Sequence, residues 1–150
     1  MQIIIVYMIK KWYIGFFLCL ILLLVGCTKA EDKIRGIWQI SSIYKNNVET
    51  ITESPGEVES LLCNWSFYRS KILLINYYRN NIYYKSSGNW DIDEKNDYLT
   101  VSFSDAYKEV ERIYRIEKFK SNELKVSFKE GNDEWLLVFS LQYSFQDYDF

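Results

Sequence analysis

The side chains of this chain that could do covalent or metal chemistry are three cysteines and several carboxylate pairs, and the chain has no histidine. Without histidine, Ser–His and Cys–His nucleophile pairs and histidine-ligated zinc are excluded. Two carboxylates could act as the acid and base of a glycosidase, or could ligate calcium. The pairs, however, lie on expected turns, exposed strand faces or the tail: Asp91 with Asp93, Glu109 with Glu111, and Asp147 with Asp149. We therefore predict no catalytic residue, no metal site and no cofactor.

Cys27 is the cysteine with the most informative surroundings. It follows the basic pair Lys10 and Lys11, an uncharged apolar run over residues 12–25, and the small residue Gly26. A basic start, an apolar core and a small residue at the cleavage point are typical of a secretory signal peptide. The alternative is a membrane-spanning anchor. It is disfavoured because a spanning helix needs about 20 apolar residues.

The tetrapeptide Leu24-Val25-Gly26-Cys27 resembles the signal of bacterial lipoproteins, in which Leu, a small or aliphatic residue, and Gly or Ala precede Cys. The resemblance implies that residues 1–26 are a lipoprotein signal peptide. It also implies a diacylglycerol on the Cys27 sulfur and acylation, with palmitate for example, of the new amino group. The lipid would hold the mature chain at the bacterial outer membrane, facing the periplasm or the cell surface.

The other two cysteines predict no internal disulfide. Cys19 is removed with the signal, which leaves Cys63 as the second cysteine of the mature chain besides the lipidated one. The surrounding sequence, Leu-Leu-Cys-Asn-Trp, favours a small buried apolar side chain over a reactive thiol.

The composition of the mature chain is that of one globular domain. Removal of 26 residues leaves 124, enough for a sizeable core. Loss of Lys10 and Lys11 leaves 16 basic against 20 acidic residues, a net charge of −4 without a basic cluster, so we expect no nucleic-acid partner. Aromatic side chains make up 22 of the 124 residues, which favours β-strands. We expect a polar tether over residues 27–35 and a folded domain over residues 36–150.

Alternating apolar and polar residues predict one strand after another. The expected strands cover residues 36–44, 64–69, 72–78, 82–92, 98–103, 110–119, 124–128 and 135–141. In the first connection, Ser54 as N-cap, Pro55 and Glu57 predict one short helix over residues 55–61. Eight strands with frequent turn signals favour an all-β fold, an eight-stranded antiparallel up-and-down β-barrel, with a sandwich as the alternative.

Several short motifs, taken in their order, resemble the lipocalin-like lipoproteins of Bacteroidota. They are Gly36-Ile37-Trp38, then Ser87-Gly88-Asn89-Trp90 followed by Leu99-Thr100-Val101, and then Tyr114-Arg115-Ile116 followed by Leu124-Lys125-Val126. The resemblance covers roughly residues 34–141. It implies a lipocalin-like barrel, whose interior is either filled by side chains or holds one small ligand.

The apolar side of each alternating run is expected to fill the barrel. The predicted inward residues are Trp65, Phe67, Trp90, Ile92, Leu99, Val101, Phe103, Tyr114, Ile116, Leu124, Val126 and Phe128. On the first strand, Trp38 shares a face with Ile40 and Ser42. We expect Trp38 to plug one barrel end against the short helix or the last strand.

Two arginines follow the same alternation. Arg112 shares the face of Tyr114, and Arg69 follows Trp65 and Phe67 in the same way. An inward guanidinium would need an acidic partner or a ligand carboxylate. We favour the alternative, in which a bulge turns these side chains outward.

The candidate ligand-binding residues are Trp38, Trp65, Trp90 and Tyr114, which could line an apolar cavity. Core packing is the alternative role for them, and we favour it. We expect at most a small cavity, open at the end away from the helix, with a ligand touching Trp90 and Tyr114. The predicted function is a non-enzymatic, membrane-anchored protein that binds a small apolar ligand or a protein partner. The alternative is a structural or inhibitory envelope module with a solid core.

Overall fold

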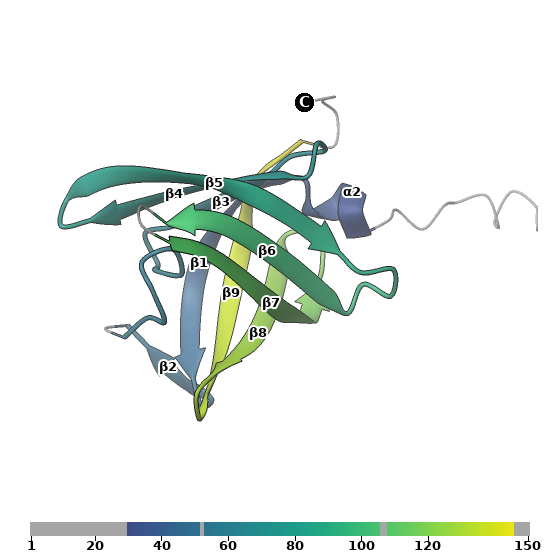
Figure 1. Ribbon diagram of the computed structural model, residues 1–150. Helices are drawn as coiled ribbons and strands as arrows, with labels where there is room; N and C mark the ends of the chain where they lie inside the picture. The colour runs from purple at the N-terminus through teal and green to yellow at the C-terminus, as the bar shows by residue number, and fades with distance from the viewer. Residues whose placement is uncertain (1–29, 52, 106–107, 146–150) are drawn as a thin grey trace, which may run out of the picture.

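The computed structural model describes residues 30–51, 53–105 and 108–145 (Figure 1). The predicted signal peptide and the predicted lipidation site Cys27 lie outside these residues, as do Asp147 and Asp149. Within the described ranges, no helix has the length and apolar character that a membrane span requires. In the same part of the chain, no three His, Cys, Asp or Glu side chains gather as they would around a metal ion.

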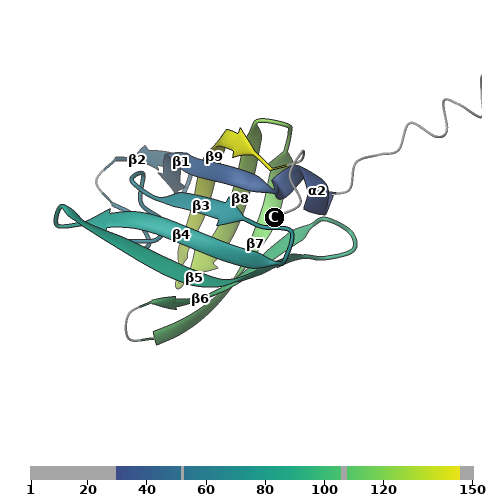
Figure 2. The same cartoon turned by 90° about the horizontal axis from the view of Figure 1, so that it is seen from above.

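A single antiparallel sheet contains most of the described chain. Its strands are β1 (Gly36–Lys45), β2 (Val48–Thr50), β3 (Asn64–Phe67), β4 (Ile72–Arg79), β5 (Ile82–Ile92), β6 (Tyr98–Asp105), β7 (Lys108–Phe119), β8 (Glu123–Glu130) and β9 (Asp133–Ser144). From β3 to β9 each strand pairs with the next, and β1 pairs with both β3 and β9, which closes the sheet (Figure 2). The eight strands β1 and β3–β9 confirm the predicted all-β antiparallel barrel. The short strand β2, which pairs with the second half of β1, was not predicted.

The predicted helix over residues 55–61 is wrong. The segment consists of turns and bends, in which the N–H of Ser60 donates to the carbonyl of Glu57 and the hydroxyl of Ser54 donates to the carbonyl of Gly56. A helix of two turns is marginal in water without tertiary support, and Gly56 weakens it further. Val58 and Glu59, which would lie inside that helix, are instead buried against the barrel, where they accept hydrogen bonds from Trp65 and Tyr114.

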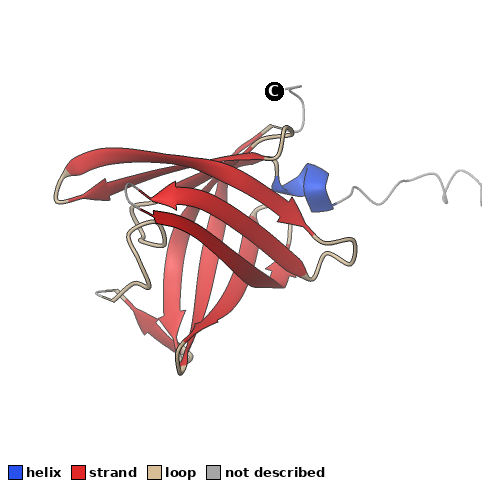
Figure 3. Cartoon of the chain, in the orientation of Figure 1, coloured by secondary structure: helices blue, strands red, loops and turns tan. Residues whose placement is uncertain are grey.

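The short helix of the described chain is α2 (Ala30–Ile34), which lies before β1. Part of the expected tether over residues 27–35 is therefore folded: Ile34 is fully buried, and its carbonyl accepts a hydrogen bond from the indole N–H of Trp38 at 2.7 Å. Figure 3 shows α2 at one end of the barrel, while the connection from β2 to β3 lies at the opposite end.

The barrel interior contains the side chains that alternation predicts. Eleven of the twelve predicted inward residues are buried in the core, and the remaining one, Ile116, is partly buried against it. On β1 the prediction holds for Trp38 and Ile40 but fails at Ser42, because Ile43 is buried instead. The pairing of β1 with β9 shifts register between Ile40 and Ser42. Such a bulge adds one residue and moves the next side chains to the other face.

Gly88 lies where the backbone of β6 leaves no room for a side chain on β5. A Cβ atom at this position would overlap the carbonyl oxygen of Ser102 and lie 2.6 Å from the Cα of Phe103. We expect Gly88→Ala to lower the free energy of unfolding by at least about 2 kcal/mol, because backbone atoms cannot move aside as a side-chain tip can. Chemical denaturation would measure the effect, with the exposed neighbour Ser87→Ala within about 0.5 kcal/mol as control. An unchanged midpoint for Gly88→Ala would refute this tight pairing.

Candidate functional site

The end of the barrel away from α2 is covered by residues 53–63, which we call the lid. The lid has no regular secondary structure, yet Val58, Glu59 and Cys63 within it are buried. Its backbone is fixed from inside the barrel, since the indole N–H of Trp65 donates to the carbonyl of Val58 at 2.9 Å. From outside, Glu57 forms an exposed ion pair with Arg79 of the β4–β5 hairpin, at 2.7 Å.

Under the lid, a buried carboxylate meets two donors from β7. Glu59 is 2% exposed, and its Oε1 accepts hydrogen bonds from Nη1 of Arg112 and from the hydroxyl of Tyr114, the latter at 2.9 Å. The guanidinium of Arg112 lies 4.4 Å above the ring of Phe128, and its Nη2 is 3.4 Å from Oε1 of Glu130 at the rim. The three residues therefore form a polar cluster on the apolar inner wall.

The inward direction of Arg112 corrects our expectation of an outward turn. The register shift of β7 lies between Ile116 and Lys118, beyond Arg112, so the alternation set by Tyr114 continues to it unbroken. The acidic partner that an inward arginine requires is Glu59, which comes from the lid 53 residues earlier. Arg69, in contrast, is exposed, as expected.

Burial controls the protonation of this cluster. It raises the pKa of the Glu59 carboxyl, whereas the charge of Arg112 and the Tyr114 hydroxyl act in the opposite direction. Burial, and then the negative charge of Glu59, raise the pKa of Tyr114, so that its hydroxyl stays protonated and can donate. The cluster is thus a carboxylate held by one cationic and one neutral donor.

The raised pKa of Glu59 predicts a pH-dependent stability. The folded protein binds this proton more tightly than the unfolded chain does. The stabilisation is therefore complete below the ordinary pKa of 4.5 and is lost as the pH rises through the folded-state value. We expect the free energy of unfolding of the wild type, relative to Glu59→Gln, to increase as the pH falls from 7 toward 4.5. Urea denaturation of both proteins across this range would measure it, and a constant difference would refute the prediction.

Trp65 and Tyr114, two of the four candidate aromatic residues, lie directly below the lid. Their ring centroids are 5.6 Å apart, in an edge-to-face arrangement. Trp90 reaches Trp65 only through Phe67, whose ring lies 5.6 Å from Trp90 and 6.0 Å from Trp65. The structure therefore brings two of the candidates into contact and connects a third through the core.

Trp38 lies apart from the lid, at the α2 end. Its ring packs 6.1 Å from that of Phe119, and its Cα pairs with Leu141 of β9. It is thus buried against the last strand, as one of our two alternatives stated, and against α2 in place of the predicted helix. The indole N–H groups of Trp38, Trp65 and Trp90 all donate to backbone carbonyls. This arrangement supports core packing, and a ligand contact by these residues stays a prediction.

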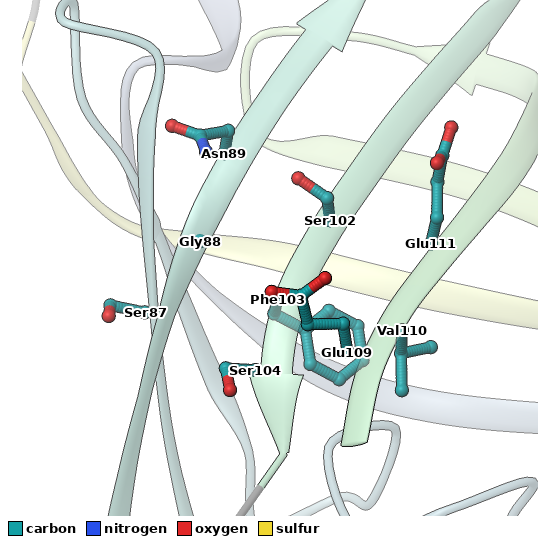
Figure 4. A pocket seen from close by; sticks show the side chains of 9 residues that line it. All are labelled: Ser87, Gly88, Asn89, Ser102, Phe103, Ser104, Glu109, Val110 and Glu111. Atoms are coloured by element: carbon teal, nitrogen blue, oxygen red, sulfur yellow. The ribbon is translucent and has the colours of Figure 1, made fainter.

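A hollow of about 460 Å³ lies on the strands β5, β6 and β7 (Figure 4). It is lined by Ser87, Gly88, Asn89, Ser102, Phe103, Ser104, Glu109, Val110 and Glu111. The lining is largely hydroxyl, amide and carboxylate groups and includes none of the four candidate aromatic residues. Glu109 and Glu111 are exposed side chains on β7. They show no sign of the burial that tunes a catalytic carboxylate.

Cys63 is fully buried at the end of the lid, and burial raises the pKa of its thiol. A thiol that stays protonated is a poor nucleophile, which confirms the predicted role as a small apolar side chain.

Glu59 is the residue of this site that the sequence did not reveal. It lies in a segment that was expected to be helical, and acidic residues on such segments are normally exposed. The available signal in the sequence was Arg112, which alternation places on the inward face. An inward arginine needs an acidic partner, but the sequence does not indicate which residue it is.

The comparisons with known proteins concern the fold. No protein-family model matches the sequence, and no curated protein matches it either. The structure is similar to the crystal structure of a lipocalin-like protein from Bacteroides uniformis ATCC 8492, with a TM-score of 0.55 and 10% sequence identity, over 73% of this chain and 98% of that chain. The closed eight-stranded antiparallel barrel of this chain is therefore of the lipocalin-like kind that its motifs predicted.

Proposed function

We propose that this protein is a lipid-anchored, non-enzymatic lipocalin-like binding protein of the bacterial cell envelope, which binds a small apolar molecule under the lid. The observation that carries the proposal is the difference between the two ends of the barrel. Trp38 and α2 close one end with apolar packing, while an irregular segment held by ion pairs closes the other. Segments without regular secondary structure open at lower free energy than strands do.

The proposed anchor would give the barrel a defined direction. Only three peptide bonds separate Cys27 from the start of α2, a span of about 10 Å when extended. A lipid on Cys27 would therefore hold the α2 end close to the membrane. The lid lies at the opposite end, so a ligand would reach it from the aqueous side (Figure 1).

The test is a titration of intrinsic tryptophan fluorescence. The mature protein in lipid nanodiscs would be titrated with fatty acids, sterols and haem. We expect saturable quenching that is largely lost in Trp65→Phe, whose indole contacts the lid, and largely retained in Trp38→Phe at the far end. No response to any apolar ligand would rule out this function.

A structural or inhibitory envelope module is the second candidate, because the inner aromatic rings pack closely. The ring centroid of Trp65, for example, lies 5.1 Å from that of Phe139, 5.6 Å from that of Tyr114 and 6.0 Å from that of Phe67. A barrel of eight strands encloses little more than its own side chains unless part of the chain moves. The titration separates the two candidates, since a solid module gives no saturable signal.

A further inference from the structure

We propose that Arg112 and Tyr114 form a receptor for the carboxylate of an amphipathic monocarboxylic acid, and that Glu59 of the lid holds this receptor until such a ligand displaces it. The inference rests on the proposed function, because it names the chemical class of the ligand. It also assigns the lid a role as an internal competitor.

The receptor is built on a rigid strand. Arg112 and Tyr114 are two positions apart on β7, so that both side chains point to the same face. Both donate to the same oxygen of Glu59, so the two donors point to one place, as the binding of a carboxylate requires. The Tyr114 ring packs edge-to-face against Trp65 of β3 and Phe128 of β8, and the guanidinium of Arg112 lies over Phe128, so contacts outside the lid position both donors.

The carboxylate, by contrast, belongs to the least regular part of the described barrel. Glu59 lies between turns of the lid, whose outer fastening is the exposed pair of Glu57 and Arg79. Exposed ion pairs contribute little to stability. An incoming carboxylate would repeat the buried ion pair with Arg112 while Glu59 returned to water. Arg112 would therefore keep an anionic partner throughout the exchange. A buried charge without a partner would make displacement of Glu59 costly.

The residues beside Glu59 indicate the rest of the ligand. Val58 is buried in the core and Leu61 packs against it, so the lid presents a carboxylate next to two aliphatic side chains. An amphipathic acid presents the same chemistry. Because lid displacement vacates only the space of such small groups, the apolar body should be short. Octanoate is a suitable probe.

The experiment compares octanoate binding to the full lipidated chain in nanodiscs across three variants. Glu59→Gln weakens the internal competitor, because an amide binds a guanidinium less strongly than a carboxylate does. We expect its apparent Kd for octanoate to fall about 10-fold relative to wild type. Glu57→Gln makes the same chemical change on the lid without touching Arg112, and its Kd should stay within about 3-fold of wild type. Arg112→Gln should weaken octanoate binding about 10-fold or more. The affinity for 1-octanol, which has no carboxylate, should be the same in Glu59→Gln as in wild type.

A second measurement does not depend on the variants. Hydrogen exchange of wild type should become faster at residues 53–63 when octanoate is added, while residues 72–79 of β4 stay unchanged. Equal octanoate affinity in wild type and Glu59→Gln, equal binding of octanol and octanoate, or an unchanged or slower lid would each overturn the inference. In those cases binding itself, and with it the proposed function, would survive. If no apolar ligand binds any variant, both the inference and the proposed function fail.

Discussion

Trp38→Ala is expected to lower the free energy of unfolding by about 3–5 kcal/mol. The indole is fully buried at the α2 end of the barrel, where it contacts Phe119 and donates to the carbonyl of Ile34. Alanine would leave a cavity and an unpaired buried carbonyl, and α2 would lose its hydrogen bond with the β1 side chain. Differential scanning calorimetry should show a fall in Tm on the order of 10–20 °C.

Two matched variants separate the components of this effect. Trp38→Phe keeps an aromatic ring and removes the N–H donor to Ile34, so it should cost clearly less than Trp38→Ala. Tyr98→Ala removes an aromatic side chain that is 47% exposed, and it should cost no more than about 1 kcal/mol. A Trp38→Ala protein with the wild-type Tm would show that this residue does not plug the barrel.

Cys27→Ser should abolish incorporation of radiolabelled palmitate into the protein and leave the precursor uncleaved. Serine has no thiol to receive the diacylglycerol, and the resemblance to lipoprotein signals places cleavage after this modification. Cys19→Ser and Cys63→Ser are matched controls that should keep full labelling, since the first lies in the predicted signal and the second is buried in the barrel. Labelled Cys27→Ser protein that partitions into detergent as wild type does would contradict the proposed anchor.

The barrel could be predicted because each strand has one buried face. Alternation is a local property, and it identified Trp65, Leu99 and Tyr114 as inward without knowledge of their neighbours. Alternation failed on β1, where it placed Ser42 inward although Ile43 is the buried residue. The bulge that causes this change of face depends on pairing with β9. Register between strands distant in sequence has no local signal.

The lid could not be predicted for a related reason. Ser54, Pro55 and Glu57 have the local features of a helix start, but the conformation of residues 53–63 is decided by contacts with the barrel. Glu59 reaches Arg112 of β7 and Glu57 reaches Arg79 of β4, so both partners lie outside the local segment. Short segments commonly follow such tertiary contacts against their local propensity. The inward direction of Tyr114 and Trp65 was therefore predicted, whereas the inward direction of Arg112 and the buried position of Glu59 were missed.

Native mass spectrometry of the mature protein, purified from its own host, tests the central claim most directly. We expect a species heavier than the polypeptide with its proposed lipid by one small molecule, which denaturation releases as an amphipathic monocarboxylic acid. Glu59→Gln protein from the same host should retain a larger fraction of it. The lipidated polypeptide alone, in both proteins and in every preparation, would contradict the claim that this barrel carries a ligand.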